Sequence, residues 1–292
     1  MQQPYVLARA LGKSFNGKHV LDDVSFAVEP GDIVGVLGKN GAGKTTLLEL
    51  VLGFTPASGG QVEVFGHDSY RLPGTAKARV GFVPQQDELI NQLTARDQIK
   101  LIRSFYTTWD DALIERVVET WGIELDERIK NMSVGQRQKL SIVLALGHRP
   151  DLLILDEPVA SLDPLARRHF LEQIIDVAAD GQRSVVLSSH IVSDIERLAN
   201  RIWIVKDGRL HWRGDFDDLK SSVVRVHVRA AQPLPRDLRL PNALSVEYAD
   251  TYMTAVVHGW NAELEQEIAA LTRAPLEVEA LNLEDIFLAM HR

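Results

Sequence analysis

The feature that most constrains this chain is a glycine-rich segment at residues 38–45, which has the sequence GKNGAGKT and fits the pattern G-x-x-x-x-G-K-[ST]. It follows an apolar run, Ile33–Leu37, and precedes a helical pattern, Thr45–Leu52. The glycines let successive backbone N–H groups turn toward a polyanion, and the start of the following helix adds partial positive charge. The sequence therefore predicts a strand, a phosphate-binding loop and a helix, which together begin an α/β nucleotide-binding core.

Two side chains of this loop have roles that the pattern itself suggests. Lys44 supplies a positive charge for the β- and γ-phosphates of a nucleotide, and the Thr45 hydroxyl can bind Mg²⁺. The alternative is a glycine-rich turn that contains a lysine by chance. The strand and the helix on either side of the loop favour the phosphate-binding interpretation.

A second feature, a pair of acidic residues, is typical of the other half of a nucleotide site. The apolar run Leu152–Leu155 is followed directly by Asp156 and Glu157. Residues that follow a parallel strand lie at the carboxyl edge of the sheet, where α/β folds bind ligands. Asp156 therefore suits a Mg²⁺ shell, and Glu157 can orient or deprotonate a water that attacks the γ-phosphate. A solvated turn is the alternative for an isolated acidic pair, but the phosphate loop favours the functional interpretation.

The composition excludes several classes of protein and of site. With 292 residues, the chain has room for about two domains. A net charge of -8 argues against a nucleic-acid binder, since such proteins usually carry a basic surface. The chain has no cysteine, so disulfides and cysteine-ligated zinc are excluded. We expect no zinc site of any kind, because the histidines share no metal-ligand spacing.

No membrane segment is expected in this sequence. Met1–Leu11 is short and mixed in character, unlike a secretory signal. No apolar run approaches the roughly 18–20 residues that span a bilayer. If the protein works at a membrane, another chain must supply the membrane part.

Residues 1–220 alternate strand-like and helical patterns, as α/β domains do. A long helical pattern runs from Asp97 to Trp121. The expected strands are Tyr5–Ala10, Val24–Val28, Ile33–Leu37, Gln61–Phe65, Arg79–Pro84, Leu152–Leu155 and Ser184–Leu187, with a hairpin at 201–212.

Residues 221–292 have a different character and predict a small α/β appendage. The expected strands are Val223–Arg229, Leu244–Tyr248, Met253–His258 and Leu276–Ala280, and the expected helices are Ala262–Leu271 and 283–290. No catalytic motif lies in this region, and we expect it to regulate or assemble the protein.

The motifs of the first region, taken in order, resemble those of the ATP-binding subunits of ABC transporters. The resemblance covers nearly all of residues 5–220. It implies a P-loop NTPase core with an antiparallel β subdomain and a helical insertion subdomain at about 86–150. It also implies ATP and Mg²⁺ as ligands and ATPase activity.

The resemblance assigns further residues to the ATP site. Phe15 would stack on adenine, and a role as a core aromatic is its alternative. The Walker A loop would add Gly38, Lys39, Asn40, Gly41, Ala42, Gly43, Lys44, Thr45 and Thr46. Mg²⁺ would be bound by Thr45, Gln85 and Asp156.

The resemblance also assigns the catalytic residues. Glu157 would be the catalytic glutamate, and His190, after Ser188-Ser189, would be the switch histidine that contacts the γ-phosphate. Gln85 would be the Q-loop glutamine, which senses Mg²⁺ and faces the membrane subunit; Gln86 is its alternative. Asp163, in Ser161-Leu162-Asp163, would belong to the D-loop.

One motif departs from the family pattern. The family's signature usually reads L-S-G-G-Q, whereas residues 132–136 read MSVGQ. Ser133, Gly135 and Gln136 remain and would bind the ATP of a partner subunit, with Ser133 also suited to cap a helix. Val134 resists positive φ, so a glycine-only conformation at this position would weaken that contact.

The resemblance implies a motor subunit that couples ATP hydrolysis in a sandwich dimer to transport through a separate membrane subunit. We expect a homodimer at the cytoplasmic face of the cell membrane. The ending at 283–288 resembles that of export systems. The alternative is a soluble ABC ATPase of translation or repair, but the paired cassettes or the long coiled coil of such proteins are missing. Trp109 and Trp121 are expected in the core of the helical insertion, and a groove for the membrane subunit is their alternative.

Overall fold

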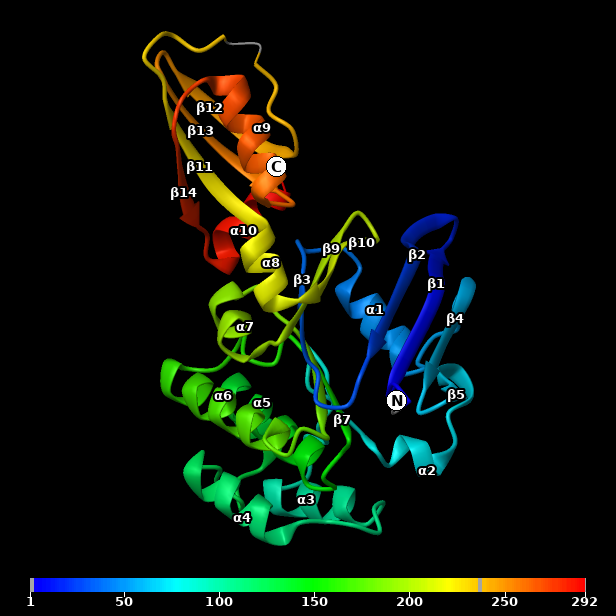
Figure 1. The fold of residues 1–292 in the computed structure, drawn as a ribbon. Coiled ribbons are helices and arrows are strands. Elements are labelled where there is room, and N and C mark those ends of the chain that lie inside the picture. Colours follow the sequence, from blue (N-terminus) through cyan, green and yellow to red (C-terminus); the bar gives the residue numbers. More distant parts are fainter. Residues whose placement is uncertain (1–2, 236–237, 292) are drawn as a thin grey trace. The chain divides into compact units, whose positions relative to one another are not determined.

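The computed structural model describes residues 3–235 and 238–291 (Figure 1). The chain forms two compact units, and the division falls between Arg213 and Gly214. The first unit holds two sheets and the second holds one. Within the described ranges, no helix combines the length and the apolar character needed to cross a bilayer. Both units mix helices with strands, so the predicted α/β class is confirmed.

The N-terminal strands form the predicted antiparallel sheet, in the order β2-β1-β4-β5. Its strands are β1 Val6–Phe15, β2 Lys18–Val28, β4 Gly59–Val64 and β5 His67–Asp68. The first two strands are longer than the sequence predicted, because register shifts between Ala8 and Ser14 interrupt the alternation of buried and exposed side chains.

The second sheet has six strands, in the order β10-β9-β3-β8-β7-β6. Its strands are β3 Ile33–Leu37, β6 Val80–Val83, β7 Leu152–Asp156, β8 Ser184–Ser188, β9 Arg201–Lys206 and β10 Arg209–Asp215. The pairs β6–β7, β7–β8, β8–β3 and β3–β9 are parallel. Every residue of β7 and β8 is buried, which explains their continuous apolar runs. The carboxyl ends of β3, β7 and β8 therefore share one edge, where α/β sheets bind ligands.

Four helices accompany this sheet. They are α1 Lys44–Val51, α5 Val134–Leu146, α6 Pro164–Ala178 and α7 Val192–Leu198. Helix α7 packs directly on β3, because a Cβ at Gly35 would lie only 2.2 Å from Cγ2 of Ile195. The strand that leads into the glycine-rich loop is thus in contact with the helix that follows β8.

A helical insertion lies between β6 and β7, within the predicted range 86–150. The single helical pattern from Asp97 to Trp121 is divided in the structure into α3 Ala95–Arg103 and α4 Asp111–Thr120. The division arises because the Asp110 side chain accepts a hydrogen bond from Leu113 N at 2.9 Å and so begins a new helix. The insertion also contains the short helix η2 Ile129–Asn131, and two other short helices, η1 Ser69–Arg71 and α2 Gly74–Lys77, precede β6.

The two tryptophans of the insertion support packing. Trp121 is buried, as predicted for the core of this subdomain. Trp109 is half-buried and covers Gly147, where a Cβ would lie 2.3 Å from its ring. The core interpretation is therefore confirmed for Trp121, and Trp109 fills the space that Gly147 leaves.

The second unit is built on an antiparallel sheet in the order β12-β13-β11-β14. Its elements are α8 Phe216–Ser222, β11 Val223–Arg229, β12 Ala243–Ala249, β13 Tyr252–His258, α9 Ala262–Thr272, β14 Leu276–Ala280 and α10 Leu283–Met290. Alternate residues of β11 and β13 form its core with Leu264 and Ile268 of α9. The predicted strands and helices of this region thus all occur.

The division between the units lies earlier than the boundary after residue 220 that the sequence indicated. Helix α8 belongs with the second unit. Its buried residue is Leu219, and the carbonyl of Ser222 accepts a hydrogen bond from Trp260 N at 2.9 Å. The helix is part of the appendage because its last turn is tied to the end of the antiparallel sheet.

Candidate active site

The glycine-rich loop connects β3 to α1. Gly41 and Gly43 have φ values of 79° and 108°, in the left-handed region that favours glycine. A Cβ at Gly38 would lie 2.7 Å from the carbonyl oxygen of Val205, so this position also excludes a side chain. Helix α1 begins at Lys44 without a side-chain cap. Its first backbone N–H groups therefore have no side-chain acceptor, and they suit an anionic group.

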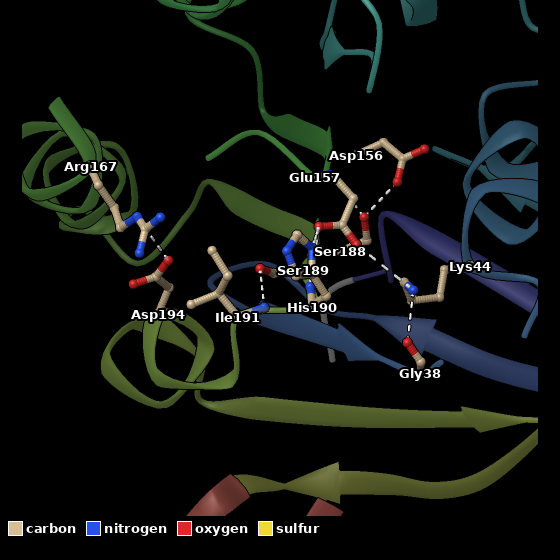
Figure 2. A network of polar contacts seen from close by, with 10 residues as sticks. All are labelled: Gly38, Lys44, Asp156, Glu157, Arg167, Ser188, Ser189, His190, Ile191 and Asp194. Carbon is tan, nitrogen blue, oxygen red and sulfur yellow. Dashed lines mark hydrogen bonds and ion pairs between the residues drawn. The ribbon is translucent and has the colours of Figure 1, made fainter. Parts of the chain in front are cut away.

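Lys44 lies at the centre of the site and is buried. Its Nζ donates a hydrogen bond to the carbonyl of Gly38 at 2.8 Å and lies 3.8 Å from Oε1 of Glu157 (Figure 2). Residues 39–41 of the loop are exposed, as is Thr45, whereas Ala42 is buried and Thr46 is half-buried. The predicted loop thus combines one buried cation with several solvent-exposed residues.

Two acidic residues lie at the carboxyl end of β7, where Asp156 is the last residue of the strand and Glu157 follows it. Asp156 and Glu157 are both buried, with exposed fractions of 3% and 8%. Ser188, which ends β8, lies opposite Asp156 in the parallel register. Its Oγ donates to Oδ1 of Asp156 at 2.5 Å and accepts from Glu157 N at 3.0 Å (Figure 2). One hydroxyl therefore fixes both acidic residues.

Glu157 also binds the histidine that follows β8. Its Oε2 accepts from the backbone N of His190 at 3.1 Å and lies 2.6 Å from His190 Nδ1 (Figure 2). Glu157 has a φ of 50°, so it adopts the left-handed backbone conformation although it is not a glycine. The His190 side chain is 56% exposed, so its ring remains accessible while one nitrogen is held by Glu157.

The structure therefore brings four predicted residues together: Lys44, Asp156, Glu157 and His190. Gln85 comes just after β6, which pairs with β7, and so lies at the same sheet edge. It is exposed, and no hydrogen bond or ion pair joins it to the cluster in the described part of the chain. Sequence analysis gave no role to Ser188. Its only sequence signal was its place at the end of an expected strand, next to Ser189 and His190.

Phe15 ends β1 and is 44% exposed. The Nζ of Lys13 lies 4.6 Å from the centre of its ring. Lys13 itself is held by Thr55 Oγ1 at 2.6 Å and Pro56 O at 2.7 Å. The ring is therefore no core aromatic, and it leaves much of its surface open for stacking.

The signature residues form a second cluster, at the start of α5. The Ser133 hydroxyl accepts from Gln136 N at 3.2 Å, and Gln136 Oε1 accepts from Ser133 N at 2.7 Å. This reciprocal pair is a capping box, so the predicted cap at Ser133 is confirmed. A Cβ at Gly135 would lie 2.9 Å from the carbonyl oxygen of Ser161, which brings α5 against the expected D-loop.

Val134 differs from the expectation that was based on φ. It is the first residue of α5 and has no positive φ. The glycine-only conformation on which the expected weakening depended is therefore not adopted in this structure, because the helical φ at Val134 suits any L-residue. Its side chain is 65% exposed.

Asp163 also lies in this second cluster. Its Oδ1 accepts from Leu165 N at 3.0 Å and from Ala166 N at 2.9 Å, so it caps α6. These backbone hydrogen bonds, with that of Ala166 the largest contribution, lower the pKa of the Asp163 carboxyl. Lys139 Nζ of α5 lies 3.9 Å from Asp163 Oδ2, which links the two helices.

The residues predicted for Mg²⁺ offer oxygen ligands only. They are a hydroxyl at the start of α1, a carboxylate at the end of β7 and an amide after β6, from Thr45, Asp156 and Gln85. Hard oxygen donors of this kind suit Mg²⁺, which keeps several waters and binds with nucleotide phosphates. Within the described ranges, no cluster of three or more His, Asp or Glu side chains has a metal-binding arrangement. The donor set therefore fits a metal that arrives with a nucleotide.

Comparisons with known proteins identify this arrangement. The profile of the family described as ABC transporter matches residues 21–160. The Nod factor export ATP-binding protein I of Paraburkholderia xenovorans (strain LB400) is 35% identical over 292 aligned residues, which cover 95% of this chain and 94% of that protein. The chain belongs to the ABC transporter ATP-binding family.

Two further similarities agree with this assignment. The ABC transporter ATP-binding protein YtrB of Bacillus subtilis (strain 168) is 28% identical over 281 residues, 96% of each chain. A solved structure described as the ATP binding subunit of an ABC transporter has a TM-score of 0.69 at 29% identity, covering 74% of this chain and 92% of that one. This ABC subunit is thus an ATPase, and a role in transport is supported over translation or repair.

Proposed function

We propose that this ABC ATPase drives export of a substrate through a separate membrane subunit, and that hydrolysis takes place at the edge shared by β3, β7 and β8. The observation that carries the proposal is a cluster beside the uncapped start of α1, in which Glu157 forms an ion pair with Lys44 and a hydrogen bond with His190. A buried cation and a buried carboxylate in contact are costly for a fold. Because both residues lie beside a phosphate-binding loop, we attribute this costly arrangement to a role in binding and hydrolysing nucleotide.

ATP binding would begin with the loop at residues 38–46. The backbone N–H groups of the loop and the Lys44 ammonium would hold the phosphates, and Phe15 would stack on the adenine. Thr45, Asp156 and Gln85 would hold Mg²⁺, which neutralises charge on the β- and γ-phosphates when it is bound. Ser188 would keep the Asp156 carboxylate turned toward that position through its 2.5 Å hydrogen bond.

Glu157 is proposed as the catalytic carboxylate. It would orient the attacking water or accept its proton, which requires a carboxylate held in a fixed position. The backbone N of His190 and the Ser188 hydroxyl hold Glu157 from two sides. His190 would contact the γ-phosphate with its exposed ring.

Two copies of the chain would sandwich two ATP molecules. The signature residues Ser133, Gly135 and Gln136 belong to a cluster other than that of Lys44, so we propose that they act on the ATP of the second copy. The exposed start of α5 supports this role, because the 65% exposed Val134 side chain marks a surface that a partner can cover. Asp163, at the adjacent D-loop, would lie at the same contact. We propose a homodimer.

The direction of transport is inferred from similarity. One relative that matches this chain over nearly its whole length is named for Nod factor export, and the ending at 283–288 resembles export systems. We therefore propose an exporter, with this subunit at the cytoplasmic face of the cell membrane. Residues 221–292 are proposed to assemble or regulate the complex.

The test is Glu157→Gln in the full chain, because the amide keeps the shape of the carboxylate but cannot accept a proton. We expect ATP affinity to be retained, turnover to fall about 100-fold or more, and an ATP-dependent dimer to accumulate in size-exclusion chromatography. Glu172→Gln, on the exposed side of α6, is the matched control and should behave as the wild type. Near-normal turnover of the Glu157 variant would mean that the base lies elsewhere.

A further inference from the structure

A second ion pair, between a half-buried arginine and a buried carboxylate, lies beside the site and has no role in the proposed hydrolysis. Nε of Arg167 in α6 lies 3.6 Å from Oδ2 of Asp194 in α7 (Figure 2). Both atoms are buried, and neither has a hydrogen-bond partner in the described part of the chain. Asp194 is only 4% exposed, and this burial raises the pKa of its carboxyl, although the nearby Arg167 and Arg197 oppose the rise.

This pair is a poor stabiliser of the fold. A buried carboxylate loses its hydration, and an ion pair without a good hydrogen bond does not recover that loss. Apolar side chains of similar size would fill the same space at a lower cost. A contribution to packing alone therefore does not explain why two charges lie here.

One end of the pair is connected to His190. Only Ile191 to Ser193 separate the histidine from Asp194, and they are tied by short-range hydrogen bonds. Ile191 N donates to Ser189 Oγ at 2.9 Å, and Asp194 N donates to the carbonyl of Ile191 at 3.2 Å. A displacement of the first turn of α7 would therefore move the segment that holds His190 against Glu157.

The other end is connected to the signature cluster. Asp163 caps α6 with its side chain, and its carbonyl accepts from Arg167 N at 2.9 Å. Arg167 therefore lies in the helical turn that Asp163 begins. Asp163 also lies near Lys139 of α5. The Arg167–Asp194 pair is thus the point at which the turn after the D-loop meets the turn after the switch histidine.

We propose that Arg167 and Asp194 are positioning residues, which transmit the position of the D-loop turn to His190 and so to Glu157. The inference rests on the proposed function, since it concerns how the catalytic carboxylate is held. Because Ile195 already fixes α7 against Gly35, the pair is not needed to keep α7 on the sheet. Its charge sets the approach of the first turn of α7 to α6.

The experiment compares three variants of the full chain: Arg167→Met, Asp194→Asn and the double variant. Each is measured for melting temperature, for affinity toward a labelled non-hydrolysable ATP analogue, and for kcat and KM of ATP hydrolysis. Arg168→Met is the matched control, because Arg168 is the next residue of α6 and pairs with Glu172 on an exposed surface, 3.1 Å away.

The expected results separate positioning from packing. Arg167→Met should lower the melting temperature most, since it leaves the Asp194 carboxylate buried without its nearest cation. The double variant should recover the melting temperature of the wild type. In all three variants, kcat should remain about tenfold low while analogue affinity and KM change by less than about twofold. Asp194→Asn alone tests the inference if the other variants fold poorly, because the half-buried Arg167 can still reach solvent.

Two outcomes would overturn the inference. If the double variant regains wild-type kcat together with its melting temperature, the pair serves packing only. If every variant resembles Arg168→Met, the pair has no role in turnover. In both cases the wild type hydrolyses ATP and the proposed function stands, whereas a wild-type chain without ATPase activity would overturn both.

Discussion

The two units of this ABC subunit place their pairs of opposite charge in different surroundings. In the first unit, Lys44 and Glu157 lie 3.8 Å apart with both side chains 8% exposed. In the second, Arg225 of β11 and Glu279 of β14 lie 3.0 Å apart, yet their side chains are 27% and 48% exposed. The shorter pair is thus the more hydrated one.

The geometry of the second pair explains its purpose. Arg225 and Glu279 stand directly opposite each other in the antiparallel register. Glu279 also lies 3.0 Å from Nε2 of His227, and the hydrogen bonds from His227 and Arg225 lower the pKa of its carboxyl. Such cross-strand pairs favour one register of a sheet at little cost, because water still reaches them.

The comparison indicates that burial, rather than the distance between the partners, distinguishes a functional charged pair. Removing an exposed partner leaves its neighbour hydrated, whereas removing a buried partner leaves an unpaired charge in the interior. A buried pair therefore persists only where something other than stability requires it. The four predictions below test this contrast, in order of decreasing effect.

Lys44→Ala should give the largest effect. It removes the buried cation of the phosphate loop and leaves Glu157 without a counter-charge, so nucleotide affinity should fall about 100-fold or more. Titration with a labelled ATP analogue at fixed Mg²⁺ measures it. Wild-type affinity in this variant would break the comparison, because the buried cation of the phosphate loop would then have no ligand to bind.

Ser188→Ala should have an intermediate effect. It removes the hydroxyl that joins Asp156 Oδ1 to Glu157 N, so both acidic residues lose one restraint while the loop remains intact. We expect kcat to fall about tenfold with affinity for ATP little changed. Steady-state ATPase assays check this, and Ser193→Ala on α7 is a suitable control. A fall in affinity without a fall in kcat would assign Ser188 to binding instead.

Arg225→Met should affect the second unit only slightly. Its partners are half-exposed and can be hydrated, so the melting temperature should fall by less than about 3 °C and the ATPase rate should not change. Differential scanning calorimetry with a parallel ATPase assay tests both statements. A loss of stability as large as that of Arg167→Met would show that exposure does not decide the cost of an unpaired charge.

Truncation after Asp215 should have the smallest effect on nucleotide binding. This cut keeps β10 whole and removes the elements of the second unit, none of which supplies a predicted site residue. Affinity for a labelled ATP analogue should stay within about twofold once circular dichroism shows that the first unit is folded. Weaker self-association is expected. Loss of binding by a folded fragment would assign part of the nucleotide site to the second unit.

Much of the fold could be predicted because local signals and buried runs agreed. The runs Leu152–Leu155 and Ser184–Leu187 are fully buried parallel strands, and the pattern of residues 38–45 fixed a strand, a loop and a helix together. The end of β1 and the start of β2 were missed, because register shifts there remove the alternation on which prediction depends. The division of the helical insertion was missed because a single capping residue, Asp110, decides it.

The part of the site that is encoded in short sequence motifs could be predicted. The residues Lys44, Asp156, Glu157 and His190 do meet, because they follow neighbouring strands or the loop between them. The bridging role of Ser188 depends on strand register, which no single stretch of sequence displays. The Arg167–Asp194 pair depends on the packing of two helices, so neither residue carried a signal on its own.

The left-handed backbone of Glu157 has a consequence for the evolution and engineering of this protein. A residue other than glycine or asparagine in that conformation costs of order 1 kcal/mol. Gly or Asn at position 157 would relieve that cost, but either residue would leave Lys44 buried without its carboxylate, which costs more. A library selected for thermal stability should therefore keep a carboxylate at this position, as a library selected for turnover should. A thermostable variant of this subunit must gain its stability elsewhere in the chain.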